Sequence, residues 1–173
     1  MQEFLYKQLE DETYSIIAYK GDEAAVTVPG MYRGQPVTIL YDDIFKGHSE
    51  VTSVTLPDCL TDIGGFVFDG CENLHHIDLP ASLENMWQYA FARCGIEEIV
   101  LPEKVRQIVS FTFKDCRQLK KIVCNDGLQH IRAWAFDGCE SLAELMHKPG
   151  AGIEISPLAF SSKESEADKK ADN

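Results

Sequence analysis

Hydrophobic residues recur along this chain at an interval of about 23 residues. Phenylalanine marks the interval at six positions: Phe45, Phe68, Phe91, Phe113, Phe136 and Phe160. Four cysteines follow with the same spacing: Cys71, Cys94, Cys116 and Cys139. A fixed period of this length predicts repeated supersecondary units that stack on one another, because a single unit is too small to bury its own apolar face.

Each unit carries two apolar positions separated by one residue. The first position is filled by Val54, Ile77, Ile99, Ile122 and Leu145. The second is filled by Leu56, Leu79, Leu101 and Cys124. Residues two apart point to the same side of a strand, so the pattern predicts one strand per unit and a parallel ladder between units. A proline ends the strand in three of the units, at Pro57, Pro80 and Pro102.

Further apolar positions complete the unit. One row is aromatic: Phe66, Tyr89, Phe111 and Trp134. The segment from this row to the cysteine contains Asp69-Gly70 and Asp137-Gly138, which favour turns, so a tight turn or a single helical turn is expected there.

The repeated pattern resembles the BspA-like leucine-rich repeats, a bacterial surface-antigen type. The segments that carry this resemblance run from Ser53 to Leu74 and from Ile131 to Leu142, and the register extends over residues 26–160. The resemblance implies a strand-rich α/β fold, a right-handed leucine-rich-repeat solenoid with a concave ladder face and short convex turns. It also implies a role in protein interaction, adhesion or host contact.

One continuous domain is expected over residues 1–160. Residues 1–50 are predicted to form an N-terminal cap and a first degenerate repeat, and residues 51–160 the repeats with a degenerate last unit. Residues 161–173 contain no large apolar side chain and are predicted to be a disordered tail of acidic and basic residues.

The chain is acidic, with 28 acidic and 16 basic residues and a net charge of −12. This balance argues against nucleic acid and against an anionic membrane surface, since both need clustered Lys and Arg. No apolar run is long enough for a membrane helix. Because the first residues lack the pattern of a secretory signal, a cytoplasmic protein is expected; the alternative is a secreted or surface protein whose signal peptide has been removed.

The cysteine row has two interpretations. Neighbouring units lie about 4.8 Å apart in a ladder, within the range that a disulfide tolerates. Buried free thiols are the alternative that we favour, since cysteine packs as a small apolar residue and persistent thiols fit a reducing cytoplasm. The sequence leaves open whether the four cysteines are oxidised. No C-x-x-C pair is present, so a zinc site is not expected.

The outer side of the ladder is the candidate binding surface, which we call the strand face. Its residues alternate with the buried strand positions and form two rows. The first row is Ser53, His76, Glu98, Lys121 and Glu144. The second row is Thr55, Asp78, Val100, Val123 and Met146, and it changes from polar to apolar along the chain. The apolar end either contacts a partner or merely suits a strand.

Three functions fit the sequence to different degrees. A non-catalytic protein-binding module is favoured, with a partner of unknown identity. A self-associating structural repeat is the second hypothesis, with homo-oligomers possible. An enzyme is the third, but the sequence has no known nucleophile or metal-binding motif, and no cofactor is expected. The adjacent His75 and His76 should point to opposite faces and therefore form no metal site.

Overall fold

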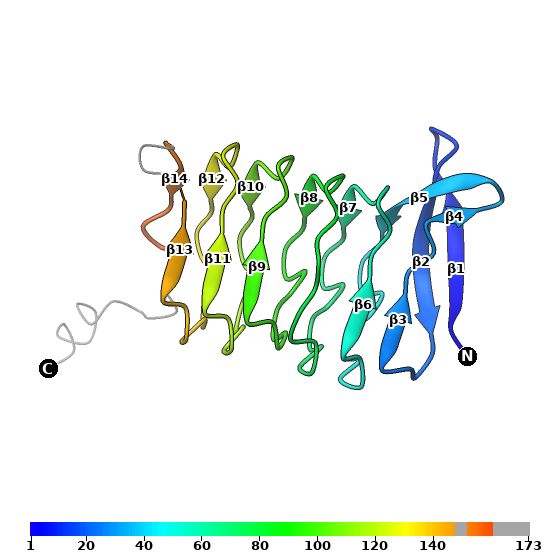
Figure 1. The fold of residues 1–173 in the computed structure, drawn as a ribbon, viewed down its shortest axis with the longest axis horizontal. Helices are drawn as coiled ribbons and strands as arrows, with labels where there is room; N and C mark the ends of the chain where they lie inside the picture. Colours follow the sequence, from blue (N-terminus) through cyan, green and yellow to red (C-terminus); the bar gives the residue numbers. More distant parts are fainter. Residues whose placement is uncertain (148–151, 161–173) are drawn as a thin grey trace, which may run out of the picture.

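The computed structural model describes residues 1–147 and 152–160, which form a stack of short strands and turns (Figure 1). The described residues contain no helix, and none of them forms a helix capable of crossing a membrane. The convex segments, where single helical turns were one expectation, consist of turns instead. Hydrogen bonds between residues three apart close these turns, such as the bond from the Asp69 N–H to the Phe66 carbonyl at 3.1 Å. The predicted tail at 161–173 lies outside the described residues.

The predicted strand of each unit belongs to what we call the first ladder. Its strands are β3 (Ala25–Thr27), β6 (Ser53–Thr55), β9 (Glu98–Val100), β11 (Lys121–Val123) and β13 (Glu144–Met146). All pairs are parallel, and equivalent residues are in register, as with Ile99, Ile122 and Leu145. The buried positions Val54, Ile77, Ile99 and Ile122 face the core, as the alternation predicts.

A second ladder runs along the other side of the stack. Its strands are β5 (Gln35–Leu40), β7 (Asp62–Ile63), β8 (Asn85–Met86), β10 (Gln107–Ile108), β12 (His130–Ile131) and β14 (Glu154–Ile155). Each of these strands is two residues long except β5, which has six. The pairs that they form within this ladder are all parallel. This second ladder was not predicted from the sequence.

The N-terminal segment closes one end of the stack. Strands β1 (Glu3–Gln8) and β2 (Tyr14–Lys20) form an antiparallel hairpin, and β2 then pairs with β5, which also pairs with β4 (Met31–Tyr32). The buried ring of Tyr19 lies 5.0 Å from the ring of Phe45 and thereby covers the first turn of the core. Burial and a hydrogen bond to Glu23 raise the pKa of Tyr19 to about 12, so this phenol stays neutral at physiological pH.

The periodic phenylalanines form a continuous column of rings. Successive centroids lie 5.2 to 5.6 Å apart from Phe45 to Phe160, with ring planes within 18° of parallel. The five rings from Phe45 to Phe136 are fully buried, whereas Phe160 at the end of the column is 48% exposed. The core is therefore a chain of nearest-neighbour contacts between turns.

A second, half-exposed column contains the aromatic row. The rings of Phe66, Tyr89, Phe111 and Trp134 stack at 4.6, 5.0 and 5.5 Å. All four residues have φ near +60°, a left-handed conformation that is uncommon for bulky side chains. The stacking of successive rings offsets the backbone strain, which each turn repeats.

Asn125 stands where the three preceding turns have a proline. Its buried side-chain amide donates to the carbonyls of Pro102 and Val105 on the previous turn, and its oxygen accepts from the Gly127 N–H at 2.8 Å. These bonds satisfy the buried polar group, so the substitution keeps the turn in place.

Both ladders are interrupted at one level of the stack, which we call the junction. Residues 76–78 form no ladder pair with β6 or β9, and β8 does not pair with β10, within the described part of the chain. Figure 1 shows β8 and β10 standing apart there. The chain is one residue shorter at this level, because Cys94 and Ile96 are two apart whereas Cys71 and Leu74 are three apart.

Gly95 makes the shorter segment possible. A Cβ atom at this position would lie 2.0 Å from the carbonyl oxygen of Glu72 on the previous turn. The Gly95 N–H donates a hydrogen bond to the Cys71 carbonyl at 3.1 Å. The missing residue thus draws the backbones together at this corner, at the same level of the stack where both ladders open.

Candidate functional site

Eight of the ten predicted residues of the strand face lie on strands β6, β9, β11 and β13 of the first ladder, whereas His76 and Asp78 lie on the unpaired segment between β6 and β9. All ten are exposed except Lys121 and Val123, which are half-buried. Strand pairing puts Lys121 between Glu98 and Glu144, and Val123 between Val100 and Met146. Equivalent residues of β9, β11 and β13 therefore line up in two rows, as predicted. His76 and Asp78 belong to the same two rows in the sequence pattern but lie on an unpaired segment.

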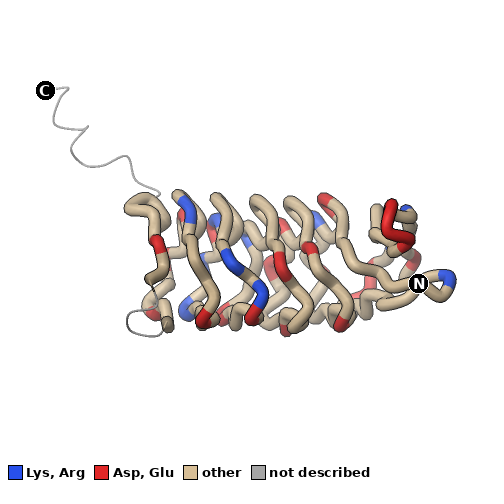
Figure 2. The backbone as a smooth tube through the Cα atoms, turned by 90° about the horizontal axis from the view of Figure 1, so that it is seen from above, with Lys and Arg blue, Asp and Glu red and all other residues tan. Residues whose placement is uncertain are grey.

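The first row carries two carboxylates, of Glu98 and Glu144, and one ammonium group, of Lys121. Asp78 and Glu103 add two carboxylates beside it. Lys121 Nζ lies 3.9 Å from the Glu98 carboxylate, and the His76 Nε2 lies 3.0 Å from the Asp78 carboxylate. The His76–Asp78 pair is exposed and the Lys121–Glu98 pair is partly exposed, so both contribute little to stability. Figure 2 shows acidic positions on turns all along the stack. A basic partner segment would meet favourable charge here, and an acidic one would be repelled.

The second row ends in an apolar ridge formed by Val100, Val123 and Met146. Val100 is 56% exposed and Met146 is 47% exposed, while Val123 is half-buried between them. The ridge is continuous because the three residues occupy equivalent positions on adjacent strands. Apolar side chains gathered in this way on an otherwise charged surface are typical of contact sites.

A groove of about 580 Å³ adjoins the ridge at the junction. It lies between the segment 76–81 on one turn and the segment 98–103 on the next. His76, Asp78, Glu98 and Glu103 supply polar groups, and Val100 forms part of the wall. The groove and the ridge together form a surface that could hold an extended segment of another protein.

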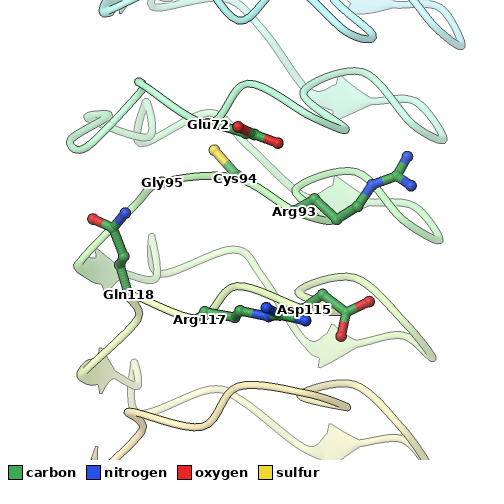
Figure 3. Close-up of a pocket in the computed structure, with 7 residues that line it drawn as sticks. All are labelled: Glu72, Arg93, Cys94, Gly95, Asp115, Arg117 and Gln118. Atoms are coloured by element: carbon green, nitrogen blue, oxygen red, sulfur yellow. The ribbon is translucent and has the colours of Figure 1, made fainter.

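A second hollow of about 370 Å³ lies on the turn side of the junction, beside Gly95 (Figure 3). Glu72 and Cys94 approach it from neighbouring turns, and Arg93 points away from Gln118 in this view. The Arg93 guanidinium instead binds the buried Asp69 carboxylate through two hydrogen bonds, of 2.7 and 3.0 Å. This ion pair raises the pKa of Arg93. Arg117 is the other basic residue that lines the hollow, and its guanidinium has no ion pair within the described residues.

The four periodic cysteines are free thiols whose Sγ atoms point along the stack. Cys116 and Cys139 donate to the carbonyls of Phe91 and Phe113 at 2.8 and 2.9 Å, and Cys71 donates to that of Phe45 at 3.2 Å. Burial raises the pKa of Cys94 to about 12 and also raises the pKa of Cys71 and Cys116. The thiols of Cys71, Cys94 and Cys116 therefore remain protonated and inert at neutral pH.

We expect alkylation to separate these thiols by their burial. In the folded protein at pH 8, iodoacetamide should modify the half-exposed Cys59 and Cys139 first and leave Cys71, Cys94 and Cys116 unmodified, since the thiolate is the reacting form. In denaturant without reductant, all six cysteines should react. Peptide mass spectrometry provides the measurement, and four protected cysteines after denaturation would indicate disulfides instead.

No set of three or more His, Cys, Asp or Glu side chains converges on a possible metal position in the ranges 1–147 and 152–160. His75 contacts the carbonyl of Gly95 at 3.1 Å through Nδ1, while His76 contacts Asp78, so the two histidines have separate partners. The arrangement supports binding through shape, apolar contact and charge.

The junction, the groove and the hollow were not predicted from the sequence. The missing residue between Cys94 and Ile96 was the available signal, because it shortens one phenylalanine interval to 22 residues. The left-handed conformation of the aromatic row was also missed, because Gly, Asn and Asp are its usual sequence signals and none of them stands in this row.

The repeat region matches the family model for the BspA type leucine-rich repeat region in six copies, over residues 38–166. No curated protein matches the chain. Among solved structures, a leucine-rich repeat protein of T. pallidum is similar at 24% identity with a TM-score of 0.74, over 98% of this chain and 94% of that one.

Two longer proteins share the fold. A leucine-rich repeat protein of Bacteroides ovatus matches at 22% identity and a TM-score of 0.72, over 93% of this chain and 50% of that one. A leucine-rich cell surface protein of Faecalibacterium prausnitzii matches at 21% identity and a TM-score of 0.59, over 84% and 54%. The chain spans about half the length of these two proteins.

These matches confirm the predicted strand-rich solenoid. Repeats of this type indicate a protein-interaction or structural role and generally occur in binding modules rather than enzymes. With six copies covering most of its length, the chain belongs to the BspA type leucine-rich repeat family.

Proposed function

We propose that this chain is a protein-binding module that holds its partner on the strand face. The observation that carries the proposal is the apolar ridge of Val100, Val123 and Met146 beside the 580 Å³ groove. Interfaces draw most of their affinity from a few buried apolar anchors surrounded by polar groups, and the ridge with its acidic border has this composition.

The border residues indicate the character of the partner. Asp78, Glu98 and Glu103 line the groove, and the whole chain has a net charge of −12. A segment with apolar side chains for the ridge and basic side chains for the groove is the best complement. Adhesion or contact with a host at the bacterial surface is the setting that we propose from the family, and the F. prausnitzii relative is a named cell surface protein.

The test is a triple substitution on the ridge, Val100→Lys, Val123→Lys and Met146→Lys. We expect it to weaken partner capture about a hundredfold or more, because it places charge at apolar anchors. Capture is measured by affinity pull-down from host and bacterial extracts, followed by binding measurements with the purified partner.

The matched control carries the same added charge away from the strand face, as Gln8→Lys, Gln129→Lys and Ser141→Lys, all at exposed positions. It should bind like the unsubstituted protein. If the ridge variant captured the partner as well as the control variant does, and both variants kept the circular dichroism of the folded protein, the partner would use another surface.

Self-association is the second candidate. The edge strand β13 pairs only with β11 among the described strands, and it carries Met146 at the end of the ridge. Exposed strand edges with apolar neighbours favour pairing between chains. Light scattering over a concentration series distinguishes the two proposals, since a strict monomer at high concentration removes this one.

A further inference from the structure

Trp87 is an exposed aromatic side chain that belongs to neither ring column. It is 47% exposed, and its indole has no ring contact or hydrogen bond within the described residues. The register of β5, β7 and β8, continued by one residue, puts Tyr41, Gly64 and Trp87 at equivalent positions on three successive turns. Tyr41 is also exposed, at 55%. Two aromatic side chains thus flank a position that has no side chain.

A groove of about 550 Å³ lies against Trp87 on the second ladder. Gly65, Phe66, Gln88 and Val109 line it together with Asp42. The groove is separate from the strand face, which lies on the first ladder.

The paired glycines position a carboxylate in this groove. The Gly65 N–H donates to Asp42 Oδ1 at 2.8 Å. A Cβ atom at Gly64 would lie 2.7 Å from the same oxygen, so a larger residue there would push the carboxylate away. Asp42 is exposed and forms no ion pair in the described structure, and the lining contains no basic residue to neutralise it.

The turn that carries Asp42 shows, at the edge of the same groove, how this fold holds a cation against the lining residue Phe66. The Lys46 ammonium lies 4.4 Å from the ring centroid of Phe66 and 3.1 Å from the Asp43 carboxylate. An aromatic face and a carboxylate thus share one cation on the protein itself. The groove offers the same two kinds of group, from Trp87 and Asp42, to a cation from outside the chain.

We propose that this groove binds an alkylammonium group, either of a free quaternary ammonium compound or of a lysine side chain on another protein. Tryptophan attracts cations more strongly than the other aromatic residues. The carboxylate adds charge attraction, and the net charge of −12 favours the approach of cations. Gln88, whose side-chain amide has no hydrogen bond in the described structure, is available to polar groups of the same ligand.

The experiment uses choline chloride as the probe and the full chain with Trp134→Phe, which leaves Trp87 as the only tryptophan. Choline should change the Trp87 fluorescence saturably, with a midpoint in the millimolar range, and sodium chloride at the same ionic strength should not. A nuclear magnetic resonance titration should move the Gly65 amide signal in parallel, and Trp87→Ala should abolish that movement.

Asp42→Asn provides the sharper variant, because asparagine keeps the oxygen that accepts from Gly65 but loses the charge. It should weaken choline binding about fivefold, whereas Asp58→Asn, at an exposed position outside the groove, should leave it unchanged. Unchanged affinity in Asp42→Asn would overturn the proposal. A response to glucose as strong as that to choline would also overturn it and indicate a sugar site.

A blocked Gly-Lys-Gly peptide separates the two sources of the ammonium group. Binding about tenfold tighter than that of choline would assign the groove to a lysine of a protein partner, and weaker binding would assign it to a small quaternary ammonium compound. If neither choline nor the peptide bound, the proposed site would be refuted. The ridge variant on the strand face should bind both probes normally, so this result is independent of the proposed partner surface.

Discussion

Replacing Phe91 with alanine is expected to lower the free energy of unfolding by about 4 kcal/mol. The ring is fully buried and stacks on Phe68 at 5.2 Å and on Phe113 at 5.5 Å. Its removal leaves a cavity between turns whose ladders are already interrupted at the junction. Because a domain is stable by only about 5–15 kcal/mol, the change should be visible in urea denaturation followed by circular dichroism.

Phe160→Ala is the matched control for this prediction. Phe160 belongs to the same column but stacks on Phe136 alone and is half-exposed, so its loss should lower stability by about 1 kcal/mol. Equal losses from the two substitutions would contradict the view that each turn is stabilised mainly by its two neighbours.

Gly95→Ala is expected to destabilise the protein by about 2–3 kcal/mol through a steric conflict. The new methyl carbon would lie 2.0 Å from the Glu72 carbonyl oxygen and 3.2 Å from His75 Nδ1. A backbone oxygen cannot move without shifting its whole turn, so a small local adjustment cannot relieve this conflict. The midpoint of thermal or urea unfolding provides the measurement.

Gly47→Ala separates this steric effect from backbone conformation. Gly47 has a left-handed φ of +76° but open space around the missing Cβ, so its substitution should lower stability by only about 1 kcal/mol. Inserting one residue after Gly95 offers a complementary measurement, since it restores the Cys-x-x-Leu spacing and should relieve the close approach. A Gly95→Ala protein as stable as the parent would show that the turns separate freely at the junction.

The sequence predicted those parts of the fold that repeat over many residues. The phenylalanine column, the buried positions of the first ladder and the outward rows of the strand face follow from period and alternation, because both signals recur in several units. The role of the ten strand-face residues in binding stays a prediction, as do the domain limits and the cellular location.

Other features carry too little local signal for this kind of reasoning. A strand such as Asp62–Ile63 has only two residues, so alternation cannot be recognised in it. Phe66 and Trp134 have a left-handed backbone because stacking between turns outweighs local preference, and such contacts join residues about 23 positions apart. The Trp87 groove likewise depends on the register that aligns Tyr41, Gly64 and Trp87.

The junction also has a mechanical consequence. Ladder hydrogen bonds run along the axis of the stack, so a force that pulls the two ends apart loads them one turn at a time rather than together. At the junction the ladder bonds are missing, and ring stacking with a few turn bonds, such as the 2.9 Å bond from the Phe91 N–H to the Thr112 carbonyl, bears the tension. Under tension the protein should therefore part first into two shorter stacks at this level, so that stretching produces an early rupture before either half unravels.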